Sequence, residues 1–300
     1  MVWTLVSVAL ALLAAFGNAA ASVLQRRAAA GELAEERRSG QVRPGGVRRL
    51  GWLMGLLRRP VWLWGAGTLV LSGVCQAGAL ATGPLAVVQP VMTTELLFTL
   101  VVGSAVFRQR PDARAWWAFV AMAVGLAALL WLVRPSHGAG AVPVGRWLLV
   151  GPSLVVAVAL LTAVSVRLPS SPRATVLGSA TAIAFATTAA LMKDAIERLT
   201  QSFAALLTAW QTYGVVVAGL SGFLLLQLAL RAGTLVASQP ALTLGDAFLS
   251  VLLGTVLFDE RLALGVRVLP EVASLALIGL GSVQLARSPA VSGRDGEDMW

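Results

Sequence analysis

The segment ALATGPLAVVQP at residues 79–90 returns, with changes, as ALRAGTLVASQP at residues 229–240. Both copies begin with Ala-Leu, carry a Gly and then a Leu at the same spacing, and end with Gln-Pro. Each copy bridges two long apolar runs, so each predicts two helices joined by a short turn. A repeated apolar hairpin of this kind is typical of membrane proteins built from two related halves.

One acidic residue follows each copy of the repeat. After a shift of one residue the copies stay aligned, so that Gly103 matches Gly254 and Glu95 matches Asp246. A charge at the bilayer centre costs about 2.5–3.5 kcal/mol on insertion scales, and such residues usually face a cavity or a partner. Removal from water favours the protonated form of a carboxyl group. Glu95 and Asp246 are therefore candidate proton carriers or substrate-binding groups.

Other polar residues inside the apolar runs are candidates for contact with a substrate or a coupling ion. Pro90 and Pro240 each remove one helical hydrogen bond, so we expect a kink at each, with the neighbouring amide side chain facing a polar cavity. Hydrogen bonding between helices explains the polar residues as well as substrate contact does. The candidates are Gln89, Gln239, Asn18, Ser22, Gln76, Gln227, Trp210, Gln211 and Tyr213.

The composition excludes an ordinary soluble domain. Apolar residues make up 57% of the chain and charged residues only 12%, against about 25% charge in soluble proteins. The chain has one cysteine, Cys75, and one histidine, His137, which excludes a disulfide framework and histidine-based zinc or nucleophile sites. We expect no enzyme and no cofactor. The net charge is +9, and the arginines lie mainly at the ends of the apolar runs. This distribution is typical of membrane topology and does not indicate nucleic-acid binding.

The hydropathy pattern predicts an all-α integral membrane protein, with residues 1–287 as one polytopic domain. A membrane-spanning helix needs about 20 mostly apolar residues. On that length the chain holds about nine spans, with short junctions at 82–84 and 231–233 that predict tight antiparallel hairpins. The spans are 2–24, 60–82, 84–107, 114–133, 147–166, 174–192, 203–230, 233–258 and 264–286.

The distribution of basic residues predicts the orientation. Residues 25–59 form an Arg-rich loop with nine arginines and three glutamates. With this loop placed in the cytoplasm, 17 of the 23 Lys and Arg residues fall on the cytoplasmic side. The chain is therefore predicted to lie in the cell membrane with its N-terminus outside and its C-terminus inside. Residues 288–300 are predicted to be a disordered cytoplasmic tail.

The same orientation predicts inverted repeats. The third span would run from outside to inside and its copy, the eighth, from inside to outside. The directions are opposite because the two copies lie five spans apart, which is an odd number. Inverted repeats place a substrate site near the membrane midplane where the halves meet. The first repeat covers about residues 1–135 with four spans, and the second about 146–287 with five.

Several short motifs resemble those of the drug/metabolite transporter superfamily, also described as EamA-like. They are the hairpin Gly83-Pro84 with Pro90 six residues later, the ending Phe258-Asp259-Glu260-Arg261-Leu262, and the last span with Gly279 and Gly281. The polar segment after the first span and the opening LLRRPVWLWG at residues 56–65 are most similar to the branch of NIPA-type magnesium transporters.

The resemblance implies a secondary transporter that moves a small solute by alternating access, with possible coupling to protons. In the alternative of a magnesium or divalent-cation transporter, Glu95 and Asp246 would be the metal ligands. The acid and amide that the NIPA branch carries in its second span correspond here to Gly73 and Gln76. Because the acid is absent, a small organic metabolite is as plausible a solute as magnesium. A membrane scaffold without transport is a second alternative. The expected partners are the solute or cation, the lipid bilayer and, as an open possibility, a second copy in a homodimer, with no nucleic acid.

Overall fold

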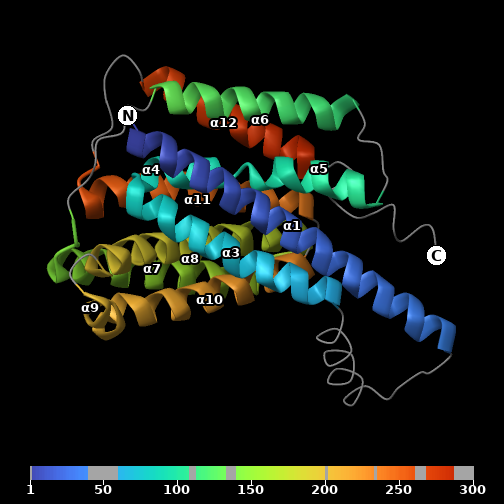
Figure 1. Ribbon diagram of the computed structural model, residues 1–300, viewed down its shortest axis with the longest axis horizontal. Helices are drawn as coiled ribbons and strands as arrows, with labels where there is room; N and C mark the ends of the chain where they lie inside the picture. The colour runs from blue at the N-terminus through green and yellow to red at the C-terminus, as the bar shows by residue number, and fades with distance from the viewer. Residues whose placement is uncertain are drawn as a thin grey trace.

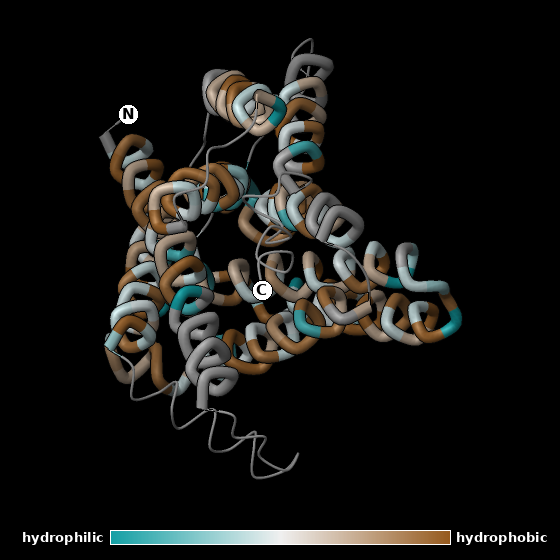
Figure 2. Tube along the Cα trace, turned by 90° about the vertical axis from the view of Figure 1, so that its right-hand side faces the viewer, coloured by the Kyte–Doolittle hydropathy of each residue, from teal (hydrophilic) through white to brown (hydrophobic). Residues whose placement is uncertain are grey.

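The computed structural model describes residues 2–39, 60–107, 113–132, 140–199, 202–232, 235–260 and 268–286. These residues form helices joined by turns and short extended segments, with no strand among them. Seven of the described helical segments are long and apolar enough to cross a membrane. Hydrophobic residues make up most of each long helix in Figure 2. The chain is therefore a multi-pass, all-helical membrane protein.

The described helices of the N-terminal half correspond to the first four predicted spans. Helix α3 begins at Pro60. Proline suits the first helical position because an N–H group there has no acceptor within the helix, so nothing is lost by its absence. Helix α4 follows Pro84, whose backbone is extended, with φ −70° and ψ 145°. The helices are α1 (Val2–Ser39), α3 (Pro60–Thr82), α4 (Leu85–Met92), α5 (Glu95–Phe107) and α6 (Ala113–Leu132).

The C-terminal half contains six described helices, one of them a single short segment. Helix α7 begins after Pro143, whose backbone is also extended. The helices are α7 (Val144–Ser165), α8 (Ser170–Leu199), α9 (Phe203–Thr208), α10 (Trp210–Ala232), α11 (Leu235–Phe258) and α12 (Val268–Ala286).

The predicted third span is two helices rather than one. The chain leaves the helix at Thr93 and Thr94, three residues after Pro90, and re-enters it at Glu95. Both threonine hydroxyls donate to carbonyls three residues earlier, at 2.6 Å and 2.7 Å, which satisfies backbone oxygens near the break. Glu95 thus becomes the first residue of α5, and the carbonyls of Thr93 and Thr94 accept from the N–H groups of Leu96 and Phe98 in its first turn. Its counterpart Asp246 lies inside the uninterrupted helix α11.

The predicted seventh span, residues 203–230, is also divided. Ala209 has an extended backbone, with φ −69° and ψ 128°, between α9 and α10. Ser202 caps α9 by accepting a hydrogen bond from the Ala205 N–H, which favours a separate short helix. A hydropathy average over apolar residues on both sides cannot detect this break.

The extent of α1 and the number of candidate spans also differ from the sequence prediction. Helix α1 continues to Ser39, so the first part of the predicted loop 25–59 is helical, and residues 40–59 lie outside the described residues. Helices α6 and α12 match the fourth and ninth predicted spans in position, but neither is among the seven candidate spans. The predicted tail 288–300 also lies outside the described residues.

The helices are arranged in layers and run broadly along the long axis of the view, with α1, α3 and α12 inclined to it (Figure 1). Helices α7, α8 and α10 lie on one side of the view, and α6 and α12 pack against each other on the opposite side. Between them lie α1, α4, α5 and α11. The turn from α3 to α4 is as tight as predicted, but α3 packs mainly against α1 and makes few contacts with α4. The two helices of the hairpin therefore diverge instead of packing along their length.

Each half repeats one packing pattern. In the first half α1 packs against α3, α4 and α5, and in the second half α8 packs against α10 and α11. Helix α7 packs mainly against α8, and its exposed side chains include Leu148, Leu149 and Val155. Such an apolar outer face suits contact with lipid.

Small residues permit the close approach of the packed helices, as is usual in membrane proteins. Gly17 of α1 lies against Ser72 of α3, and Gly222 of α10 lies against the Phe185 ring of α8. At Gly178 of α8, a Cβ atom would lie only 2.6 Å from the carbonyl oxygen of Ser238 in α11. The backbones of α8 and α11 therefore meet at a point where a side chain has no room.

We predict that Gly178→Ala destabilises the protein by about 1–3 kcal/mol, because the added methyl group pushes α11 away from α8. Unfolding by SDS in mixed micelles measures the loss. Gly151→Ala in α7 is the matched control, since a Cβ there meets nothing within 4 Å. Equal stability of the two variants would show that α8 and α11 do not meet at Gly178.

Candidate functional site

The two acids singled out in the sequence line one cavity. This cavity has a volume of about 940 Å³ and is bounded by residues of α1, α3, α4, α5, α8, α10 and α11. Glu95 reaches it from α5 and Asp246 from α11. Both halves of the chain therefore contribute a carboxyl group to the same space.

Glu95 is held by a chain of polar contacts across three helices. Asn18 Nδ2 of α1 donates to Glu95 Oε2 at 3.2 Å. The hydroxyl of Ser72 in α3 lies 2.7 Å from Asn18 Oδ1 and 2.6 Å from the Ala14 carbonyl oxygen. Its single hydrogen can be donated to only one of these two oxygens at a time. Asn18 thus lies between Ser72 and Glu95 and contacts each with a different atom of its amide.

Two buried polar atoms of lining residues have no hydrogen-bond partner among the described residues. They are Nε2 of Gln89, which is a donor, and Oδ1 of Asp246, which is an acceptor. Gln89 is only 3% exposed. A buried polar atom without a partner costs about 1–3 kcal/mol. Both atoms are covered by neighbouring atoms, but their residues line the cavity, so a small rotation of either side chain would present the unpaired atom to a bound molecule.

Three further polar residues that the sequence singled out also line the cavity. Ser22 lines it beside Asn18, as expected from their shared helix face. Gln76 of α3 and Gln227 of α10 also line it, from nearly matching positions in the two repeats. Pro90 lies inside α4, one residue after Gln89. The backbone of residues 239 and 240 is part of α11, but the Gln239 and Pro240 side chains lie outside the described part of the chain.

Three candidate residues are placed away from the cavity. Trp210 packs edge to face on Trp147, with ring centroids 5.6 Å apart, and is 45% exposed. Tyr213 is exposed, and its hydroxyl donates to the Leu207 carbonyl at 3.0 Å. Gln211 is fully buried, and its Nε2 donates to Asp194 Oδ2 at 2.8 Å. Contacts at the start of α10 therefore occupy these side chains.

Asp194 is the centre of a buried polar cluster that the sequence analysis did not identify. Its Oδ1 accepts from the Val142 N–H at 2.9 Å, and its Oδ2 accepts from Trp147 Nε1 and Gln211 Nε2, both at 2.8 Å. The carboxylate has no exposed surface. It joins α7 and α10 to α8 near one end of the bundle.

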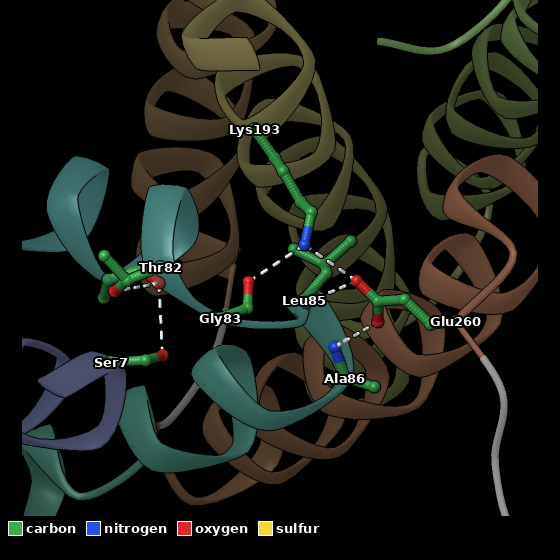
Figure 3. Close-up of polar contacts among 8 residues, drawn as sticks. Ser7, Thr82, Gly83, Leu85, Ala86, Lys193 and Glu260 are labelled. Atoms are coloured by element: carbon green, nitrogen blue, oxygen red, sulfur yellow. Dashed lines mark hydrogen bonds and ion pairs between the residues drawn. The ribbon is translucent and has the colours of Figure 1, made fainter. Parts of the chain in front are cut away.

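Beside Asp194, Lys193 of α8 forms a buried ion pair with Glu260, the second residue after α11 (Figure 3). Lys193 Nζ lies 2.9 Å from Glu260 Oε1, and it donates at the same distance to the Gly83 carbonyl. The ammonium also lies 5.1 Å from the centre of the Phe258 ring, within range of a cation–π interaction. Lys193 is 5% exposed and Glu260 is 4% exposed.

Glu260 also caps the start of α4. Its Oε1 accepts from the Leu85 N–H at 2.7 Å and its Oε2 from the Ala86 N–H at 3.0 Å (Figure 3). These N–H groups would otherwise be unpaired at a helix start, because Pro84 supplies no side-chain cap. The carboxylate therefore joins α11, α8 and the α3–α4 turn.

Glycines at two positions permit close packing around the α3–α4 turn and Glu260. A Cβ at Gly83 would collide with Ser7 of α1, whose hydroxyl donates to the Ala79 carbonyl at 3.1 Å. A Cβ at Gly254 of α11 would collide with the Glu260 carboxylate. Gly83 and Gly254 are both part of the repeated sequence pattern.

The ion pair and the cavity lie at successive levels along the same helices. On α8 the lining residues end at Met192, just before Lys193, and on α4 they begin at Gln89, one turn after Leu85. Gly254, which meets Glu260, is eight residues beyond Asp246, or about 12 Å along α11. The ion pair therefore lies beyond one end of the cavity.

The other end of the cavity is formed by the opposite ends of three helices. It is lined by Gln25, where the apolar part of α1 finishes, by Trp62 at the start of α3 and by Leu230 near the end of α10. Leu230 is 37% exposed, whereas the ion pair is buried. Among the described residues, this end therefore has a partly exposed side chain, and the opposite end has a buried ion pair.

The sequence contained a signal for the ion pair. Lys193 is the chain's only lysine, and because the predicted sixth span ends at residue 192, the prediction places Lys193 in the following loop. In the structure it belongs to α8, inside a candidate membrane span. Glu260 was named only as part of a closing motif. Their pairing joins residues 67 positions apart and therefore requires the fold.

The chain is 28% identical over 250 residues to an uncharacterized protein of Corynebacterium glutamicum, with 79% of this chain and 85% of that protein covered. No model of a protein family and no solved structure matches the chain.

We predict that Lys193→Met lowers the free energy of unfolding by about 3–5 kcal/mol, because it leaves the Glu260 carboxylate buried without a counter-charge. Unfolding by SDS in mixed micelles measures this change in the free energy of unfolding. Adding Glu260→Gln should restore part of the loss, because the neutral amide leaves no uncompensated charge.

Asp259→Asn is the control for this comparison. Asp259 pairs with Arg146 at 2.7 Å, but the two side chains are 55% and 38% exposed, so the substitution should cost about 0–1 kcal/mol. If Lys193→Met costs no more than Asp259→Asn, the Lys193–Glu260 pair is not buried as described.

Proposed function

We propose that the protein is a secondary transporter that moves a small solute across the cell membrane by alternating access. The observation that carries the proposal is the shared cavity, which takes one carboxyl group from each half of the chain. Carboxyl groups at membrane depth are costly and usually serve a substrate or proton pathway. A scaffold without transport has no use for two such groups on a cavity wall.

The repeated packing supports two related halves, as the drug/metabolite transporter resemblance implies. If α1, α3, α4 with α5, and α6 correspond to α8, α10, α11 and α12, each helix of the first half has a counterpart. Helix α7 is then the additional element that makes the second half larger. Glu95 and Asp246 take matching places in this scheme, and the cavity lies where the halves meet.

Alternating access requires a closed end that can open, and the Lys193–Glu260 pair supplies one. The pair links α8 and the end of α11 in the second half to the α3–α4 turn in the first. Separating the halves at this end would break these contacts together. With the orientation predicted from the arginines, the closed end faces outside and the Gln25–Trp62 end faces the cytoplasm.

The two carboxyl groups allow coupling to protons. A carboxyl group removed from water readily takes a proton, and a bound cation and a proton would then compete for the same oxygens. Magnesium remains the second candidate, because the two carboxyl groups share the cavity with the oxygens of Asn18, Gln89, Gln76 and Gln227. Mg²⁺ commonly binds through one or two carboxylates and keeps several waters.

The test is transport by proteoliposomes that contain a pH-sensitive dye or, in parallel, a magnesium-sensitive dye. External amines, amino acids, organic acids or MgCl₂ are added one at a time. We predict that one class of solute provokes a proton flux, and that Glu95→Gln and Asp246→Asn each lower it at least about tenfold, since each removes a charge that the cargo or proton needs.

Asp259→Asn is the control, because it removes an exposed carboxyl group that does not line the cavity. A magnesium signal lost in both acid variants, without a solute-linked proton flux, would favour the cation transporter. Wild-type flux in both acid variants would show that Glu95 and Asp246 have structural roles only, and the proposed site would be wrong.

A further inference from the structure

The described residues that line the cavity carry an excess of acidic over basic side chains. Among the described residues that line it, Glu95 and Asp246 are acidic and none is Lys, Arg or His. Lys193 follows the lining residue Met192 in the chain, but its ammonium is bonded to Glu260 and Gly83 beyond the end of the cavity. A bound anion would therefore meet two carboxyl groups without a counter-charge, whereas a cation would neutralise one of them.

The two unpaired atoms specify complementary groups on the cargo. Asp246 Oδ1 needs a hydrogen-bond donor, which a protonated amine supplies together with positive charge. Gln89 Nε2 needs an acceptor, such as a hydroxyl or carbonyl oxygen. A bare metal ion satisfies the first atom but offers no acceptor to the second.

One part of the wall fits an apolar body, beside lining residues with hydroxyl and amide groups. Aromatic side chains reach the cavity from three helices, as Trp62 of α3, Phe185 of α8 and Phe223 of α10, and Met92 and Met192 lie among them. Aromatic faces attract organic cations, and the volume of about 940 Å³ is within the range of small-molecule sites. A divalent metal ion prefers oxygen ligands and gains nothing from these aromatic and methionine side chains.

We propose that the cargo is a monovalent organic cation, a protonated amine that also carries a hydroxyl or carbonyl oxygen on an apolar body. This inference rests on the transport function proposed above and names the chemical class of its substrate. The ammonium group donates to Asp246, the oxygen accepts from Gln89, and the apolar part lies against the aromatic side chains. Glu95, already held by Asn18, is left as the carboxyl group that exchanges a proton.

The first experiment compares four probes of known charge with the purified full-length protein in detergent. 2-Amino-1-phenylethanol is a cation with a hydroxyl group, phenyl-1,2-ethanediol is its neutral analogue, mandelate is an anion of similar shape, and MgCl₂ supplies the metal. Thermal unfolding at rising probe concentration gives an apparent Kd for each. We expect saturable stabilisation by the amine, and binding at least about tenfold weaker for the diol and mandelate.

Variants identify the contacts. Asp246→Asn and Gln89→Leu should each weaken amine binding at least about tenfold, because each removes a group that pairs with one end of the probe. Asp259→Asn should leave it unchanged. Stabilisation by mandelate or MgCl₂ that exceeds that by the amine and depends on Asp246 would overturn the cation proposal.

A second measurement does not depend on the choice of probe. Gln227→Cys places a thiol on the cavity wall, and Cys75→Ala removes the only native cysteine. A cationic methanethiosulfonate should react at least about tenfold faster than an anionic one of similar size, relative to a free thiol, because two acids are nearby. The preference should fall in Asp246→Asn. Equal rates, together with no binding of the amine, would contradict the proposal.

The outcomes separate this inference from the transport function. An amine that binds through Asp246 but never crosses a proteoliposome membrane would refute transport and leave the cationic site in place. An anion or a metal ion that crosses, with flux dependent on Asp246, would refute the cationic cargo and leave transport in place.

Discussion

The buried pair of Lys193 and Glu260 holds the two halves of this protein together at one end. A buried charge without a counter-charge is costly inside a membrane, so each partner stabilises the other. The Glu260 carboxylate has in addition taken the place of a helix cap, since it accepts both N–H groups at the start of α4. Removal of this carboxylate would leave the Lys193 ammonium without a counter-charge and the N–H groups at the start of α4 without acceptors. The closed end thus depends on one side chain.

The two halves are alike in packing but differ at their acids. In the first half the helix breaks at Thr93 and Thr94, and Glu95 begins a new helix with an amide donor in contact. In the second half Asp246 lies within a continuous helix, and one of its oxygens is buried without a partner among the described residues. Under the proposed transport function, this asymmetry would let Asp246 bind the cargo and Glu95 exchange the proton.

Much of the site could be predicted from the sequence, because a repeated motif and isolated acids in apolar runs are local signals. Glu95, Asp246, Gln89, Asn18, Gln76 and Gln227 all line the cavity. Gln211 has the same polar, intramembrane character, yet its amide is bonded to Asp194. Polarity alone cannot distinguish a cavity residue from one that pairs with a distant helix. Lys193 and Glu260 were missed because charges at the end of an apolar run resemble loop residues.

The most direct test asks from which side the cavity can be reached. A Gln76→Cys thiol, in a chain with Cys75→Ser, is treated with a membrane-impermeant thiol reagent from each side of sealed, oriented vesicles. The account predicts labelling only from the side that bears Gln25 and Trp62, and added labelling from the opposite side once Glu260→Gln weakens the closed end. Equal labelling from both sides with the ion pair intact, or no change on its loss, would contradict it.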